Sequence, residues 1–262
     1  MVEFTSTQLF GWVSAFLWPL TRILGVIASA PLLSHRSIPT RVKLGLGLLL
    51  AMLVAPALPP FPEQDPLSWA GLLILAQQML IGLAIGFVLR IIFTGVELAG
   101  EMIGMTMGLG FATFFDPGSQ GRSSVISQFL SLLLLLLFLG SDLHLLLIEA
   151  LVESFTLLPI TTEPVQRGGL QQIAYWGARI FGLGLQLAMP ALTALLITNM
   201  ALGVLTRAAP QLNLFGIGFP VTMTVGFVMI MLSLPYWSQP MLEALREGLA
   251  MVRQVTLALS PA

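Results

Sequence analysis

The sequence predicts an all-α polytopic membrane protein built from helical hairpins, with long kinked helices packed in a larger helical assembly. Of its 262 residues, 56% are hydrophobic and only 9% are charged, whereas soluble domains have about 25% charged residues. The mean hydropathy is +0.94. Long apolar runs follow one another with only short polar connections between them. A surface of this composition is suited to lipid or to other apolar helices.

The apolar runs differ in length, and this difference predicts how the helices are used. About 20 residues cross a bilayer core, so the first, second and sixth runs each fit one crossing. The third run would form a helix of about 70 Å at about 1.5 Å per residue, and the fifth is also too long. Because long polar loops are missing, we expect hydrophobic helices that continue beyond the membrane inside a protein assembly. The six runs are Leu9–Leu33, Val42–Leu58, Trp69–Phe115, Ser124–Leu158, Leu170–Leu205 and Leu214–Trp237.

Prolines mark the expected turns and suggest a weak internal repeat. Residues Thr21–Pro56 and Leu205–Pro235 each contain Ala-Pro, a short polar stretch, an apolar residue before proline, a glycine-bearing apolar run and a terminal proline. Duplicated broken hairpins occur in transport proteins, but chance explains the match equally well in a chain with 17 prolines.

After the second copy, Ser238–Leu259 is expected to form an amphipathic helix that is too polar to span the membrane. This helix docks on a neighbour, lies at the membrane interface or is solvated.

The distribution of charge in the first loops predicts an orientation. Arg36, Arg41 and Lys43 lie between the first two runs, whereas Glu63 and Asp65 follow the second run. By the positive-inside rule, the first loop is cytoplasmic and the N-terminus is periplasmic.

The formal net charge of the chain, −1, argues against a nucleic-acid partner.

Two sets of charged residues stand out within the apolar runs, where ionisable groups are costly and therefore candidates for function. Those of the third run are spaced seven and four apart, so they share a helix face, and those of the fourth run repeat this spacing. Arg90 can neutralise the carboxylates of the first set, and Arg179 can neutralise those of the second set. A structural role as ion pairs and subunit contacts is favoured over a proton relay. The two sets are Arg90, Glu97 and Glu101, and Asp142, Glu149 and Glu153.

Glycines recur at four-residue spacing along the third run. Gly100, Gly104 and Gly108 form one stripe, and Gly82 and Gly86 form another. Such stripes allow helix backbones to approach closely. They indicate helix packing and do not indicate chemistry.

A glycine-flanked segment rich in phenylalanine follows the first stripe. It contains three aromatic rings and then an Asp-Pro-Gly turn. Apolar rings in such a segment suit a gate that closes a pore by packing and dewetting, and an ordinary buried connection explains them equally well. The residues are Gly110, Phe111, Phe114, Phe115, Asp116, Pro117 and Gly118.

Signatures of catalysis are missing from the sequence. His35 and His144 are the only histidines, no HExxH or GxSxG pattern occurs, and cysteine is absent. We therefore expect neither catalytic, cofactor-binding nor metal-binding residues, and no nucleotide site.

Three motifs resemble those of the FliR family of flagellar export proteins. The first is Thr206–Pro220 with Val221–Gly226 after it, the second is Gly110–Ser119, and the third is Arg41–Leu46. They occur in order and the resemblance covers essentially the whole chain. The residues that match the hairpin motif are Pro210, Gln211, Asn213, Phe215, Gly218 and Pro220.

This resemblance implies a structural, pore-forming subunit of the flagellar type III export gate, in the basal body at the bacterial inner membrane. One copy would assemble with several copies of FliP and FliQ, and with FlhB and membrane lipid, and would pass unfolded flagellar proteins. The chain would be a single subunit, with a FliP-like part at about residues 1–170 and a FliQ-like part at about 171–262. Residues Gly110–Gly118 correspond to the family's pore plug. The rival function is a proton-coupled secondary transporter of small solutes, which would use the buried carboxylates.

Overall fold

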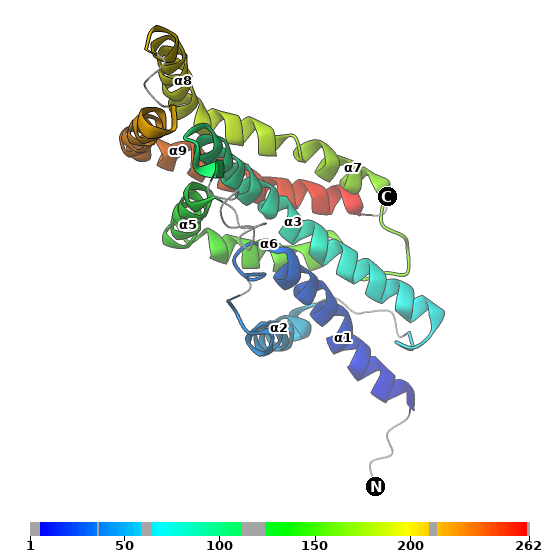
Figure 1. Ribbon diagram of the computed structural model, residues 1–262. Helices are drawn as coiled ribbons and strands as arrows, with labels where there is room; N and C mark the ends of the chain where they lie inside the picture. The colour runs from blue at the N-terminus through cyan, green and yellow to red at the C-terminus, as the bar shows by residue number, and fades with distance from the viewer. Residues whose placement is uncertain (1–5, 36, 59–63, 112–123, 210–213, 261–262) are drawn as a thin grey trace. The chain divides into compact units, whose positions relative to one another are not determined.

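The computed structural model describes residues 6–35, 37–58, 64–111, 124–209 and 214–260 (Figure 1). Within these ranges every regular element is helical and no strand occurs, which confirms the predicted all-α class. The α-helices are α1 (Ser6–Ser29), α2 (Thr40–Val54), α3 (Trp69–Thr106), α5 (Val125–Gly140), α6 (Leu143–Leu157), α7 (Arg167–Trp176), α8 (Arg179–Ala208) and α9 (Phe219–Leu259). Three shorter helical segments are η1 (Ala55–Ala57), η2 (Leu109–Phe111) and η4 (Leu214–Gly218).

Several of these helices are long and apolar enough to cross a membrane. Among the described residues they are Trp69–Thr106, Arg167–Ala208 and Gly216–Leu259, and the pair α5 and α6 counts as a fourth when taken together. The third apolar run forms a single helix of 38 residues, about 57 Å long at about 1.5 Å per residue. The polytopic helical fold is therefore confirmed.

The fourth apolar run is interrupted between α5 and α6. Asp142 has φ 56°, the only positive φ at a non-glycine position among the described residues. Asp is one of the few residues that adopt this left-handed conformation readily. A helix cannot continue through such a residue, so one run becomes two helices.

The C-terminal helix differs from the expected arrangement. The sixth apolar run, Leu214–Trp237, and the amphipathic stretch Ser238–Leu259 are expected to be distinct segments, but they share one helix, since α9 runs for 41 residues through both Pro235 and Pro240. Between the prolines, the indole Nε1 of Trp237 donates a hydrogen bond to the carbonyl oxygen of Leu187 on α8, at 3.2 Å. This bond and the burial of Trp237 and Met241 hold the helix together where each proline removes a backbone hydrogen bond.

The chain divides into two compact units. One consists of residues 1–91, 142–177 and 246–262, and the other of residues 92–141 and 178–245. These units do not test the predicted FliP-like and FliQ-like parts, which stay a prediction.

Within the first unit, α1 lies directly against the start of α3 (Figure 1). A Cβ at Gly82 would overlap the carbonyl of Arg22 and lie 3.0 Å from the Cα of Gly25. A Cβ at Gly86 would overlap the hydroxyl of Ser29. The stripe of Gly82 and Gly86 therefore brings two helices of the same chain into backbone contact.

A buried arginine joins three helices of this unit. Arg22 on α1 has no exposed surface, and its Nε donates to Gln78 Oε1 on α3 at 2.8 Å. Its Nη1 donates to the carbonyl and hydroxyl oxygens of Ser154 at 2.8 and 3.2 Å. Its Nη2 donates to the carbonyl of Leu158, just past the end of α6, at 2.9 Å. The guanidinium also lies over the Phe155 ring, 4.2 Å from the centroid, which adds a cation–π attraction.

Replacing Arg22 is expected to destabilise the protein strongly. Arg22→Met removes four hydrogen bonds and takes away the donor of two buried acceptors, Gln78 Oε1 and the Leu158 carbonyl, at about 1–3 kcal/mol for each acceptor left unpaired. Arg22→Lys should recover only part of the loss, since an ammonium lacks the planar fork of donors. Thermal unfolding of the detergent-purified complex measures the effect. The control is Arg41→Met, at an exposed position, and an equal loss of stability there would contradict the role given to Arg22.

Candidate functional site

The structure describes only the first two residues of the predicted plug segment. Phe114, Phe115, Asp116, Pro117 and Gly118 lie outside the described residues, which stop at Phe111 and resume at Ser124. Gly110 is exposed and belongs to η2, whose last residue is Phe111.

The predicted hairpin motif is described in part. Pro210, Gln211 and Asn213 lie outside the described residues. The backbone of Phe215 belongs to the π-helical segment η4. Gly218 is buried, and Pro220 is exposed in the first turn of α9.

The upstream end of the plug segment is held against α9. Met107 follows the last residue of α3 and is fully buried, and its carbonyl accepts a hydrogen bond from Thr222 Oγ1 at 3.0 Å. Its side chain fills the space beside Gly226, where a Cβ would lie only 2.5–2.8 Å from the Met107 side-chain atoms. Gly108 then has φ 89°, a conformation that glycine adopts without strain and that ends the helix.

The described chain resumes at Ser124, which is held against α3. Ser124 is the N-cap of α5, and its hydroxyl accepts a hydrogen bond from the Ser127 N–H at 3.1 Å. The backbone N–H of Ser124 donates to the Glu101 carboxylate at 2.6 Å. Its hydroxyl also donates to the carbonyl of Gly100 at 3.3 Å. Ser127, Glu101 and Gly100 all belong to the second unit, so these contacts lie within one compact unit.

The glycine stripe on α3 provides the close approach that these contacts need. A Cβ at Gly100 would overlap the Cα of Ser127, and a Cβ at Gly104 would lie 3.1 and 3.2 Å from the Oγ and Cβ of Ser124. Gly100 and Gly104 therefore face α5 of the same chain, whereas Gly108 serves the helix end. Any part they play in contacts between subunits stays a prediction.

The first set of predicted charges makes contacts with serines. Arg90 is exposed and its Nη1 lies 3.5 Å from Ser34 Oγ. Glu97 is half-buried, and its Oε1 accepts from Ser131 Oγ at 3.3 Å. The predicted neutralisation by Arg90 is not among the described contacts, and the burial of these charges in an assembly stays a prediction.

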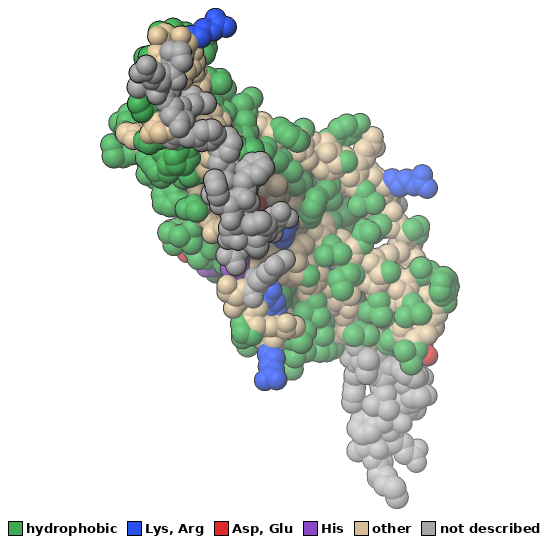
Figure 2. Space-filling model, in the orientation of Figure 1, with side chains coloured by type: hydrophobic (Ala, Val, Ile, Leu, Met, Phe, Trp, Pro, Cys, Tyr) green, Lys and Arg blue, Asp and Glu red, His purple; other side chains and the backbone are tan. Residues whose placement is uncertain are grey.

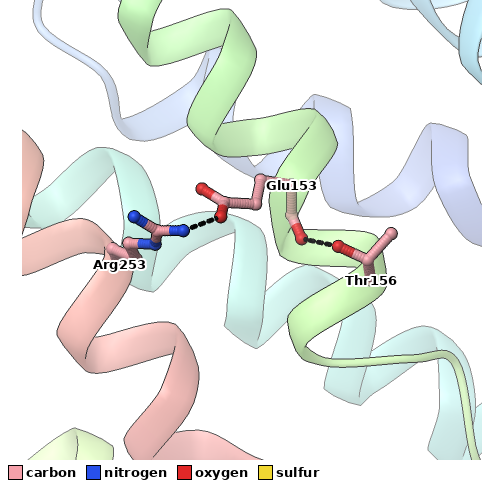
Figure 3. Close-up of polar contacts among 3 residues, drawn as sticks. All are labelled: Glu153, Thr156 and Arg253. Carbon is pink, nitrogen blue, oxygen red and sulfur yellow. Dashed lines mark hydrogen bonds and ion pairs between the residues drawn. The ribbon is translucent and has the colours of Figure 1, made fainter.

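In the second set, Glu153 is paired with a cation that the sequence did not single out. Its carboxylate forms an ion pair with Arg253 on α9, and its carbonyl accepts a hydrogen bond from Thr156 Oγ1 at 2.8 Å (Figure 3). Asp142 and Glu149 are exposed, and Arg179 is partly buried at the start of α8. Arg253 belongs to the polar face of the predicted amphipathic helix. This polar face was the sequence feature from which a partner for Glu153 could have been predicted.

Sequence reasoning also missed Arg22. It lies within the first apolar run, Leu9–Leu33, so the rule that selected charges in the longer runs applies to it equally.

No group of three or more His, Asp or Glu side chains among the described residues is arranged to hold a metal ion. The expected lack of catalytic and cofactor-binding residues stays a prediction.

Comparisons with known proteins agree with the resemblance seen in the sequence. Residues 13–248 match the family described as "Bacterial export proteins, family 1". The chain is 46% identical over 235 residues to the flagellar biosynthetic protein FliR of Pectobacterium carotovorum subsp. carotovorum, covering 90% of each protein. It is 45% identical to FliR of Escherichia coli K12, again over 90% of each, and 35% identical to that of Buchnera aphidicola subsp. Acyrthosiphon pisum, over 90% of this chain and 91% of the relative. The chain therefore belongs to the FliR family of flagellar biosynthetic and bacterial export proteins.

Proposed function

We propose that this chain is a structural, pore-forming subunit of the flagellar type III export gate, through which unfolded flagellar proteins cross the inner membrane. The observation that supports this most directly is the 46% identity to a FliR protein over 90% of both chains. The membrane-length apolar helices fit a location in the inner membrane. We place the gate in the flagellar basal body, with the N-terminus of this chain in the periplasm.

The exposed surface of the chain fits a protein that works inside an assembly. Large apolar side chains are exposed along both long C-terminal helices, including Phe181 (70%) and Met200 (73%) on α8 and Tyr236 (78%) on α9. Hydrophobic side chains also cover much of the face seen in Figure 2. Apolar patches of this kind mark contacts with other proteins or with membrane. Export-gate subunits FliP and FliQ, FlhB, and lipid are the proposed partners, with one copy of this chain in the complex.

The proposed subunit has no catalytic step of its own. Its role is to shape the pore together with its partners, through a FliP-like part at about residues 1–170 and a FliQ-like part at about 171–262. Energy for export would come from other parts of the apparatus.

Residues Gly110–Gly118 are proposed to be the plug of the closed pore. Phe111, Phe114 and Phe115 supply apolar rings that exclude water and ions from a narrow passage. The described neighbours of this segment, Met107 and Ser124, are each held by hydrogen bonds to another helix.

The first test is whether the chain depends on its partners. Produced alone in detergent, it should aggregate or give poor yields because its exposed apolar side chains lack partners. Produced together with FliP and FliQ, it should be recovered in one complex whose native mass exceeds that of the chain. A monodisperse chain that transports a small solute by itself would instead support the secondary-transporter function.

The second test removes the plug. Deleting Phe111–Phe115 should leave the complex assembled but raise its ion conductance, since the rings that exclude water are gone. Conductance is measured in liposomes that contain the complete complex. The control replaces the exposed residues Phe227 and Val228 of α9 with alanine and should not raise the conductance. An assembled deletion complex with the conductance of the intact one would refute the plug.

A further inference from the structure

Two cations from different helices converge on Ser34, a few residues past the end of α1. The ammonium Nζ of Lys43 on α2 donates a hydrogen bond to the carbonyl oxygen of Ser34 at 3.0 Å. The guanidinium Nη1 of Arg90 on α3 lies 3.5 Å from the hydroxyl oxygen of the same residue. We call Ser34, Lys43 and Arg90 the basic cluster. All three residues belong to the first compact unit, so their arrangement is internal to that unit.

The two cations of the basic cluster keep donors that the chain does not use. An ammonium has three N–H groups and a guanidinium has five, whereas the described contacts of both cations are those with Ser34. The described ion pair of the chain joins Glu153 to Arg253, on other helices. Among the described residues, no carboxylate contacts Lys43 or Arg90. An anion from outside the chain can therefore bind both.

The place of Lys43 on its helix is not explained by helix stability. Lys43 lies in the first turn of α2, which also contains Arg41 and has no acidic residue. The dipole at the start of a helix favours negative charge, so cations in this turn are unfavourable unless an anion lies nearby. The motif Arg41–Leu46 thus has a charge pattern that the formation of α2 does not require.

The position of Arg90 along α3 corresponds to the level of a phospholipid headgroup. The 21 residues of Trp69–Leu89 contain no charged side chain. At about 1.5 Å per residue this stretch is about 30 Å long, which is the thickness of the hydrocarbon core of a bilayer. Trp69 at its start is 77% exposed, and tryptophan is enriched at membrane interfaces. A helix that crosses the core from Trp69 brings Arg90 to the opposite headgroup layer.

Both helices that supply the cations also expose apolar side chains beside them. Those of α3 precede Arg90 at spacings of three and four residues, which places them on the same face of the helix. Those of α2 follow the same spacing and start next to Lys43. From the cluster α2 runs back along α1, because a Cβ at Gly47 would meet the side chain of Leu24. The exposed side chains are Leu83 and Phe87 on α3, and Val42, Leu46, Leu49 and Leu53 on α2.

We propose that the basic cluster binds the phosphate of an anionic phospholipid, whose acyl chains cover the exposed apolar side chains of α2 and α3. Basic pockets between membrane helices bind anionic headgroups. The planar fork of Arg90 can donate to two phosphate oxygens, whereas Lys43 acts as a point charge. This inference deepens the proposed membrane location by naming a lipid class and its contacts, and it rests on that location.

Lipid binding by the complete complex with FliP and FliQ tests the site. Native mass spectrometry counts the lipids bound to the detergent-purified complex during titration with phosphatidylglycerol, or with phosphatidylcholine of the same acyl chains. The complex should prefer phosphatidylglycerol, because the choline group of phosphatidylcholine neutralises its own phosphate. The double variant Lys43→Gln and Arg90→Gln should bind one phosphatidylglycerol fewer for each copy of this chain.

Single variants separate the cluster from general surface charge. Lys43→Gln and Arg90→Gln should each weaken phosphatidylglycerol binding at this site about five-fold, the effect of one cation near an anionic surface. Arg90→Lys keeps the charge and should keep most of the binding. The matched control is Arg41→Gln, which removes a charge from the same turn at a position about 200° around the helix from Lys43. Binding to this control should equal that of the intact complex.

Inorganic phosphate distinguishes a lipid site from a site for any phosphate. At the concentration at which phosphatidylglycerol saturates the site, free phosphate should not displace the lipid, because it makes no contact with the apolar side chains. Displacement at that concentration would contradict the part given to the acyl chains.

The remaining outcomes separate the lipid site from the proposed function. Unchanged binding in the double variant would overturn the site, and so would equal weakening by Arg41→Gln. In both cases the complex is still recovered with FliP and FliQ, so the export-gate function stands. If Arg90→Gln prevents assembly, Lys43→Gln on the largely exposed helix α2 decides the question. Failure to recover any complex from the intact chain would contradict the proposed function and not the lipid site alone.

Discussion

The buried guanidinium of Arg22 is the interaction on which the first compact unit depends. Its four described hydrogen bonds all end on neutral oxygens, two of them the carbonyls of Ser154 and Leu158. The Ser154 carbonyl also accepts from the Leu158 N–H at 2.9 Å, whereas the Leu158 carbonyl lies just past the last residue of α6, where the helix dipole favours a cation. The end of α6 therefore compensates the charge of Arg22, while Arg22 satisfies the end of α6. Neither group would be stable in this apolar interior without the other.

Hydrogen bonds from one helix to the backbone of another recur elsewhere among the described residues. A chain with 9% charged residues has few side chains with which to satisfy backbone groups, so neighbouring helices provide them. The Trp176 indole donates to the carbonyl of Val88 within the first unit. In the second unit, Thr222 donates to Met107, and Glu101 accepts from Ser124. The polar residues that this family member retains inside its apolar segments thus connect helices, as expected where water is excluded.

The all-α class could be predicted from the sequence alone, because long apolar runs joined by short connections are compatible with few folds other than a helical membrane protein. The sequence was insufficient where the outcome depends on contacts between distant positions. Arg22 was detectable as a charge in an apolar run, but its acceptors at Ser154 and Leu158 lie 132 and 136 positions away. The apolar run up to Trp237 and the amphipathic stretch after it look like distinct segments, and the hydrogen bond from Trp237 to Leu187, 50 positions away, supports α9 where it continues through the prolines. Glu101 was selected as a charge, yet its partner is a backbone N–H, which no residue pattern reveals.

The interleaving of the two compact units imposes an order on biosynthesis. The chain passes between the units four times, and residues 246–262 return to the unit that contains residues 1–91. In that unit the last turns of α9 contact α7, where Gln166 donates to the carbonyl of Leu259 at 3.1 Å. Because chains begin to fold during synthesis, the first unit is complete only after residues 246–262 have been made. Until then, Glu153 of α6 and the start of α7 lack the partners that Arg253 and Leu259 provide, and these helices are open to chaperones, to the insertion machinery and to proteolysis.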